Sequence, residues 1–411
     1  MSKQLSKGEI SPYSQLDQVD WLIPAFTSLL SEQGYSPASI SGKINIIRNF
    51  SLWSMKRRLK VYELDQHSIK LFFVEQPRAG YDRRGELATL YSLLDWLQEF
   101  GHIQLPSPDT HDTELNGIMR GFSRYLEDER GLSRATVSTY IPLVRNFLSE
   151  LFGSGHISLN KSDASFVTQF VLRHARTMST SRAQLMTTSL RGFFRFLCVR
   201  GDISFELAAS VPTVASWRLS EIPKSLSPEE VERVLQSCDR DTAIGKRDYA
   251  TLLLLARLGL RAGEIVAMTL DDMNWDAGVL TLHGKGARKA QLPMPNDVGE
   301  AIALYLRQGR PICKTRSMFI RSRAPYQGFS SSVAIVDIVR RSLAKAGLNP
   351  IRKGAHLLRH SLATKMLERG ACLAEIREIL RHSTINTTEI YAKVDLVALS
   401  GLAQPWPGGD A

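Results

Sequence analysis

The chain has 411 residues, a net charge of +11 and a pI near 9.5. This length predicts two or three domains, each large enough to form its own hydrophobic core. Hydrophobic residues make up 43% of the chain and charged residues 23%, which excludes a disordered protein. The surplus of basic residues indicates a polyanionic partner, more commonly nucleic acid than an anionic membrane surface.

The cysteines and the apolar runs bear on the cellular compartment. Four cysteines lie far apart without any C-x-x-C pair, so we expect reduced thiols rather than disulfides. The N-terminal segment lacks the apolar stretch of a signal peptide. The longest apolar run, near 251–258, is interrupted by Arg257 and is too short to span a bilayer. We therefore expect a cytoplasmic protein with no membrane partner.

Two pairs of segments about one hundred residues apart are similar within the first half of the chain. Residues 29–50 and 126–147 share a Glu-x-Gly-x-Ser-x-Ala pattern and both end in Arg-Asn-Phe. Residues 90–103 and 190–203 share apolar positions at helical spacing before a Gly-x-Ile stop. The pattern predicts an N-terminal tail over 1–16 and two tandem all-α domains over 17–108 and 109–214. A duplicated scaffold that only spaces other parts is the alternative, and it is stronger for the first copy.

In each copy the Gly-x-Ser sequence predicts the end of one helix and the start of the next. Ser36 and Ser133 are the expected N-caps. Residues 215–226 contain proline and little helical periodicity, which favours a linker. Ser227, followed by Pro-Glu-Glu, then opens a helix and with it a third domain over 227–396. Residues 397–411 form a C-terminal tail.

The third domain is predicted to be mainly α with one small β-sheet, an α+β fold. Two strands over 279–283 and 289–294 flank a glycine-containing turn at 284–288. The periodicity predicts helices over 248–258, 261–268, 297–306, 333–346, 356–369, 373–380 and 386–394.

Cations and one tyrosine recur at the edges of these predicted elements. They are Arg261, Lys285, His356, Arg359, His382 and Tyr391. Arginine forks bind two phosphate oxygens at once and keep their charge, so such a set favours a phosphodiester substrate. A tyrosine beside these cations is a feasible nucleophile, because the cations favour its phenolate form.

Three stretches of the third domain resemble the tyrosine recombinases, a family of the phage-integrase and Xer type. They are LGLRAGEIVAMTLDDMNWDAGVLTLHGKGARK, HLLRHSLATKMLERGA and ILRHSTINTTEIYAKVD. The resemblance is strong over 222–396, and 115–210 looks like the family's core-binding domain. It implies that Arg261 and Arg359 are catalytic arginines, Lys285 the hairpin lysine, His356 and His382 the two histidines, and Tyr391 the nucleophile. One departure is Arg381, where the family usually has glycine.

Some of these single residues also allow other assignments. Arg288 or Lys289 could be the basic residue that reaches out of the turn, but the family's lysine follows a glycine, as Lys285 does. His356 and His360 are four residues apart on a helix, which is also zinc-ligand spacing. The zinc-protease pattern needs glutamate where Leu357 stands, so we expect no metal and no other cofactor.

The resemblance implies a clamp on double-stranded DNA and strand exchange through a 3′-phosphotyrosyl intermediate, without metal or ATP. Lys285 would be the general acid, His356 the proton acceptor near the tyrosine and His382 a hydrogen-bond donor. The resemblance also implies a homo- or hetero-tetramer on paired sites, in which partner recombinases can take part. The protein is expected to associate with the nucleoid when it is bound to DNA. The segment after Tyr391 is expected to dock on a neighbouring protomer. The extra first repeat suggests a mobile-element or plasmid recombinase.

Two rival functions stay open from the sequence. A type IB topoisomerase shares the catalytic set, although the length and the two helical repeats favour the recombinase. A catalytically impaired DNA-binding member of the same fold is the second rival, and Arg381 is the feature of the sequence that favours it.

Overall fold

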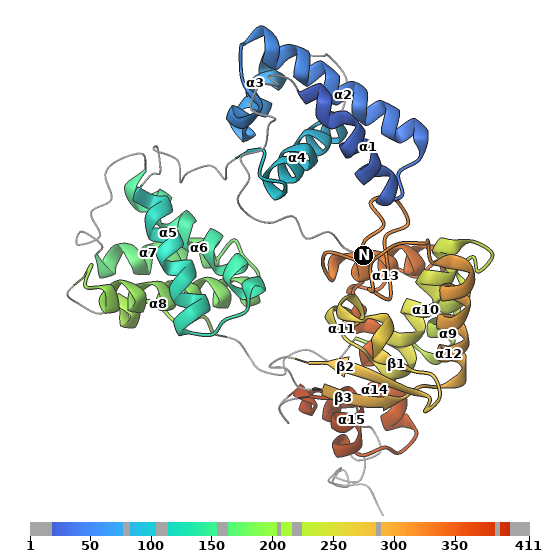
Figure 1. The fold of residues 1–411 in the computed structure, drawn as a ribbon. Helices are drawn as coiled ribbons and strands as arrows, with labels where there is room; N and C mark the ends of the chain where they lie inside the picture. Colours follow the sequence, from blue (N-terminus) through green and yellow to red (C-terminus); the bar gives the residue numbers. More distant parts are fainter. Residues whose placement is uncertain are drawn as a thin grey trace, which may run out of the picture. The chain divides into compact units, whose positions relative to one another are not determined.

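The computed structural model describes residues 19–76, 83–103, 114–153, 163–203, 207–215, 224–284, 289–382 and 387–394 (Figure 1). Three bodies, each with its own hydrophobic core, make up these residues, and each is described by itself. The predicted tails at 1–16 and 397–411 lie outside the described residues. So do residues 216–223 of the predicted linker and Lys285.

The first body is all-α and is built from the first sequence repeat. Its helices are α1 (Ile23–Glu32), α2 (Pro37–Lys56), α3 (Gln66–Glu75) and α4 (Arg84–Glu99). Gly34 has a φ of +85°, which glycine adopts without strain, and Ser36 then accepts a hydrogen bond from the Ser39 N–H to begin α2. Buried aromatic side chains from α1 to α4, including Phe26, Phe50 and Phe72, form the core.

The second body repeats this plan of four α-helices. Its α-helices are α5 (Glu114–Arg124), α6 (Arg134–Phe152), α7 (Ala164–Ala175) and α8 (Thr180–Arg200), with a π-helical turn at Tyr125–Glu129 and a 3₁₀-helix at Leu207–Ser210. Ser133 begins α6 by accepting from the Thr136 N–H, so both predicted N-caps are confirmed. Five phenylalanines with no exposed surface lie in its core: Phe122, Phe147, Phe170, Phe193 and Phe194.

The third body contains the α-helices that follow α8 in the described residues. They are α9 (Pro228–Gln236), α10 (Ala243–Leu258), α11 (Ala262–Ala267), α12 (Asn296–Leu304), α13 (Val333–Lys345), α14 (Ala355–Glu368) and α15 (Leu373–Leu380). Short helical turns at Leu270–Asp272, Tyr305–Gly309 and Glu389–Val394 complete the set. Ser227 begins α9, as the Ser-Pro-Glu-Glu sequence predicts, and the structure adds a reciprocal capping box between Ser227 and Glu230.

A small antiparallel sheet belongs to the third body. Its strands are β1 (Met273–Asn274), β2 (Val279–His283) and β3 (Lys289–Pro293), in the order β1-β2-β3. Leu280 and Leu282 point into the core, and the intervening residues of β2 are less buried, as the alternating pattern of a half-buried strand requires. The two predicted strands are confirmed. β1 was not predicted, because two residues carry no readable periodicity.

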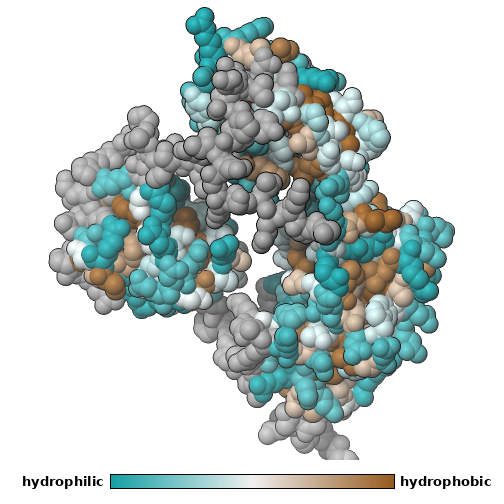
Figure 2. All heavy atoms as spheres, viewed as in Figure 1, coloured by the Kyte–Doolittle hydropathy of each residue, from teal (hydrophilic) through white to brown (hydrophobic). Residues whose placement is uncertain are grey.

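The predicted fold class is confirmed: the chain is mainly α with one small sheet in its last domain. One predicted element differs, because the helix expected over 386–394 is a 3₁₀-helix that begins at Glu389. Hydrophilic residues dominate the face of the described parts that Figure 2 shows, since most large apolar side chains lie in the cores. Among the described residues, no helix is both long and apolar enough to cross a bilayer.

Candidate active site

The turn between α10 and α11 places the first arginine. Gly259 ends α10 with a φ of +57°, and Arg261 then begins α11 two residues later. A Cβ added to Gly259 would lie 2.6 Å from Leu380 Cδ2, so both the backbone conformation and the close packing require glycine. This turn brings Arg261 beside the end of α15.

Arg359 on α14 joins two turns that are far apart in the sequence. Its side chain is buried, with 3% of the residue exposed, and it donates hydrogen bonds to the carbonyl oxygens of Gly259 and Leu380. Burial, reinforced by the positive charges of Arg261 and Arg381, lowers the pKa of Arg359 to about 10. The guanidinium is therefore still a cation at neutral pH, and the two bonds occupy only two of its five N–H donors.

Arg261 is more open than Arg359, with 40% of its side chain exposed. It donates to Glu264 Oε1 at 2.8 Å and to the backbone oxygen of Arg381 at 2.9 Å. The side chain is thus oriented from two sides while part of its guanidinium faces solvent. An arginine held in this way can bind an external anion with little loss of side-chain entropy.

Glu264 is an acid that the sequence reasoning missed. It accepts from the Arg261 N–H at 2.8 Å and from Arg381 Nη2 at 3.0 Å, and only 8% of its side chain is exposed. Burial alone would raise the pKa of Glu264, but the Arg261 N–H bond and the charges of Arg381 and Arg261 together lower it. The Arg-x-x-Glu spacing of a capping box was the available signal.

Tyr391 lies on the final 3₁₀-helix and has no exposed surface. A hydrogen bond of 2.7 Å joins its hydroxyl to His360 Nδ1, and its ring lies parallel to that of His382 with centroids 6.5 Å apart. Burial raises the pKa of Tyr391 to about 12, although the charge of Arg359 acts in the opposite direction. In this structure Tyr391 is a protonated phenol enclosed by protein.

Three histidines lie close to the arginines and the tyrosine. His382 is 8% exposed, and its Nδ1 makes a 2.8 Å hydrogen bond with Thr388 Oγ1. The ring of His356 lies 6.3 Å from that of His360, and His356 reaches solvent. Loss of hydration, followed by the charges of Arg359 and Arg261, lowers the pKa of His356. Burial is also the main cause that lowers the pKa values of His360 and His382 to about 4.

The structure brings together five of the six residues that the sequence singled out: Arg261, His356, Arg359, His382 and Tyr391. Lys285 lies outside the described residues, between the ends of β2 and β3, which pair at His283 and Lys289. His360 was considered in the sequence only as a zinc ligand, yet it contacts the tyrosine hydroxyl directly. Its neighbours in the sequence could not reveal a partner 31 positions away.

The low pKa of His382 predicts a stability loss in acid. The unfolded chain, with a histidine pKa near 6.5, takes up a proton before the folded chain does, so stability is full above that pH and falls towards pH 4. The largest effect is roughly 3 kcal/mol. We expect the melting temperature of the third body to fall less between pH 7 and pH 4.5 in His382→Asn than in the unmodified chain. An identical fall in both proteins would contradict this assignment.

Arg381 stands in the left-handed region, with φ 55° and ψ 47°. Glycine adopts this conformation freely, whereas other residues pay about 1–2 kcal/mol. Arg381→Gly and Arg381→Ala both remove the ion pair with Glu264, but only glycine removes the strain. We therefore expect the glycine variant to be more stable than the alanine variant by about 1 kcal/mol in chemical denaturation. Equal stability of the two variants would show that the backbone at this position is relaxed.

Comparison with known proteins identifies the family of this chain. Residues 224–396 match the family model described as "Phage integrase family", and residues 119–201 match "Phage integrase, N-terminal SAM-like domain". A protein of Sinorhizobium fredii (strain NBRC 101917 / NGR234), provisionally named integrase/recombinase y4rA, is 42% identical over 392 residues, which cover 94% of each chain. The chain belongs to the phage integrase family. It is a tyrosine-type site-specific recombinase.

Other members of the family align over less of the recombinase. The tyrosine recombinase XerD of Listeria monocytogenes serotype 4b (strain F2365) is 30% identical over 69% of this chain and 96% of its own length. A XerH structure bound to a palindromic difH substrate after cleavage has a TM-score of 0.56 at 21% identity, over 71% of this chain and 88% of that one. A lambda integrase (75-356) dimer bound to a core site has a TM-score of 0.51 at 15% identity, over 72% and 98%. These two structures share the fold of the recombinase.

Proposed function

We propose that this recombinase cleaves and rejoins DNA strands through a 3′-phosphotyrosyl intermediate formed by Tyr391. One observation carries the proposal: His360 bonds the Tyr391 hydroxyl, the His382 ring lies parallel to the tyrosine ring, and two oriented arginines are held by the carbonyls of the adjacent Leu380 and Arg381 in the same body. A phosphodiester undergoing substitution gains negative charge on its non-bridging oxygens. Preorganised cations stabilise that charge without a metal ion.

The proposed attack exchanges one phosphorus–oxygen bond for another. The Tyr391 oxygen forms a bond to the scissile phosphorus as the bond to the 5′-oxygen breaks, and a 3′-phosphotyrosyl ester and a 5′-hydroxyl result. The exposed part of Arg261 and the remaining donors of Arg359 bind the non-bridging oxygens. Lys285 gives a proton to the leaving 5′-oxygen. The ester keeps the bond energy, so a 5′-hydroxyl from a partner duplex reverses the step without ATP.

The proton of the tyrosine needs an acceptor. The sequence assigned this role to His356, but the hydrogen bond of 2.7 Å gives His360 the shorter path. With its pKa lowered to about 4, His360 is neutral at pH 7 and has a lone pair that can accept the proton. His382 shares this low pKa and lies against the tyrosine ring, which suits a hydrogen-bond donor that orients the site.

The nucleophile must also be uncovered before it can react. Tyr391 is fully buried in the described structure and packs with Ala363, Leu367, Ile376 and Leu380. DNA binding and assembly into a homo- or hetero-tetramer on paired sites would supply the rearrangement, with partner recombinases as alternative protomers. The segment after Tyr391 would dock on a neighbouring protomer, and that segment lies largely outside the described residues.

Covalent trapping tests the proposed function. The full chain is incubated with nicked duplexes drawn from DNA that flanks its own gene, and an adduct that survives SDS is expected. Peptide mass spectrometry should place the adduct on Tyr391, joined to a DNA 3′ end. Relaxation of unpaired supercoiled DNA at comparable rates would favour the type IB topoisomerase. Tight binding to the same duplexes without any adduct would favour an impaired DNA-binding member of the fold.

A further inference from the structure

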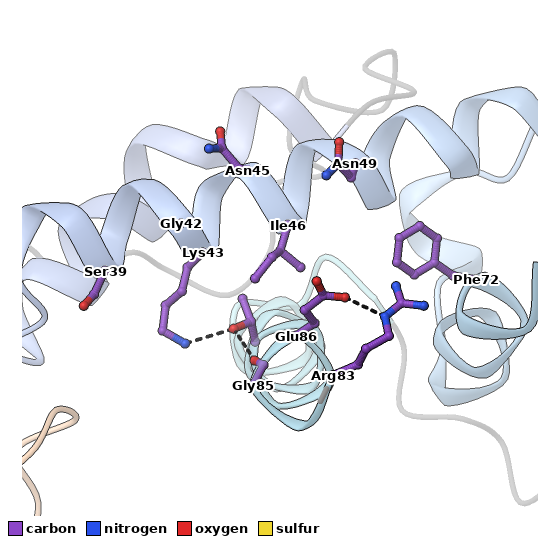
Figure 3. Close-up of a pocket in the computed structure, with 11 residues that line it drawn as sticks. Ser39, Gly42, Lys43, Asn45, Ile46, Asn49, Phe72, Arg83, Gly85 and Glu86 are labelled. Carbon is purple, nitrogen blue, oxygen red and sulfur yellow. Dashed lines mark hydrogen bonds and ion pairs between the residues drawn. The ribbon is translucent and has the colours of Figure 1, made fainter. Parts of the chain in front are cut away.

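The first helical body contains a polar groove between α2 and α4, with a volume of about 510 Å³ (Figure 3). Figure 3 shows Lys43 reaching from α2 towards α4, where its ammonium donates to Thr89 Oγ1 at 2.9 Å. Ser39, Asn45 and Asn49 of α2 also line the groove. This body precedes both segments of the chain that match family models.

The second helical body has apolar side chains where the first has this groove. By the alignment of the two repeats, Gly42 and Lys43 correspond to Thr139 and Tyr140. On the facing helix, Gly85 and Glu86 correspond to Leu185 and Met186. Tyr140, Leu185 and Met186 all pack into or against the core of the second body. The same scaffold is therefore filled in one copy and open and polar in the other.

The charges of the groove favour an anion. Lys43 is half-buried, burial lowers its pKa, and the hydrogen bond given for its ammonium goes to the neutral Thr89 hydroxyl. Glu86, the acid among the lining residues, is paired with Arg83 at 2.8 Å. A Cβ added at Gly42 or Gly85 would meet nothing within 4 Å, so a ligand can approach the backbone there. An anion bound at Lys43 would restore the interactions that its ammonium loses on burial.

We propose that this groove binds phosphates of the DNA backbone, as a contact additional to those of the two family domains. The inference rests on the proposed function, because it takes its polyanion from the reaction on DNA. The lining of α2 runs from Ser39 to Asn49, which spans about 15 Å along the helix. That length exceeds a single phosphate and suits a stretch of backbone, to which Lys43 gives a charge and the serine and asparagines give hydrogen bonds.

Two variants and one control test the groove in the full chain. Lys43→Met removes the cation. The double variant Gly42→Thr with Gly85→Leu fills the groove with the residues of the second repeat and leaves the charge unchanged. Lys56→Met is the control, because it removes an exposed lysine from the last turn of the same helix. Circular dichroism checks that each variant keeps its helices.

The affinity of each protein for DNA is measured over a range of salt concentrations on two kinds of duplex. Long duplexes extend well beyond the trapped cleavage site, and short duplexes are limited to that site. Lys43→Met and the filled variant should bind long duplexes about tenfold more weakly, and the salt slope of Lys43→Met should fall by about 1. Both should form the adduct on short duplexes at the unmodified rate, and Lys56→Met should behave as the unmodified chain. Unchanged long-duplex binding by both groove variants would overturn the proposal.

Acetylation of Lys43, followed by mass spectrometry, gives a readout independent of cleavage. Long duplexes should protect Lys43 but not Lys56, and inorganic phosphate at the same phosphate concentration should protect it much less. Equal protection by inorganic phosphate, with normal DNA binding by the filled variant, would overturn the backbone assignment in favour of a small-anion site. Protection of Lys43 by DNA without any adduct would contradict the proposed function and leave the groove supported.

Discussion

The Tyr391→Phe variant is expected to form no SDS-stable adduct with any duplex while it keeps its affinity for DNA. In the proposed mechanism the phenolic oxygen forms the bond to phosphorus, so its removal should eliminate the adduct rather than slow its formation. The variant should also lose about 1 kcal/mol of stability, because His360 Nδ1 loses its partner in a buried setting. Gel electrophoresis in SDS and a gel shift on the same duplexes measure the two properties.

Tyr305→Phe is the matched control for this variant. Tyr305 is equally buried in the third body, and its hydroxyl accepts a hydrogen bond from the Ile320 N–H at 3.3 Å. Its replacement should cost a similar amount of stability and leave the adduct intact. An adduct that persists in Tyr391→Phe, or that disappears equally in Tyr305→Phe, would show that Tyr391 is not the nucleophile.

The Arg359→Lys variant is expected to lower the rate of adduct formation by about 10²–10³-fold. A lysine keeps the charge, but its single ammonium cannot bond the Gly259 and Leu380 carbonyls and also present a planar pair of donors to a phosphate. Single-turnover kinetics on a nicked duplex, at saturating protein, would measure the chemical step separately from binding.

Arg247→Lys provides the corresponding control. Arg247 is another buried arginine, 5% exposed, that donates to the Ile320 carbonyl and to Asp248. Its replacement should lower the melting temperature without a comparable effect on the rate. Equal rate losses in the two variants would mean that Arg359 acts through the fold and has no direct role at the phosphate.

The candidate site residues could be singled out from the sequence because several lie next to a local signal. Arg261 follows a glycine at a helix end, and His356 and Arg359 share one helix. The duplicated helical domains were readable for the same reason, since capping serines and apolar periodicity are local properties. Local patterns therefore sufficed for the fold class and for most of the candidate site.

The contacts that complete the site could not be predicted in this way. Glu264 and Arg381 meet across 117 positions, and His360 meets Tyr391 across 31. Such pairs depend on how the helices pack, and local sequence patterns do not encode that packing. The left-handed backbone of Arg381 could not be predicted from the residue type either. Glycine at a position suggests a positive φ, whereas arginine does not.

The enclosed phenol of Tyr391 has a consequence for the timing of strand breakage. In the proposed mechanism, a tyrosine nucleophile with no exposed surface and a pKa of about 12 would be inert toward the phosphates that the chain meets by diffusion. The free chain would then be a latent enzyme, and a solitary encounter with a chromosome would leave both strands whole. Reactivity would be a property of the assembled complex rather than of the polypeptide, which would tie each cut to the presence of a second duplex that can rejoin it.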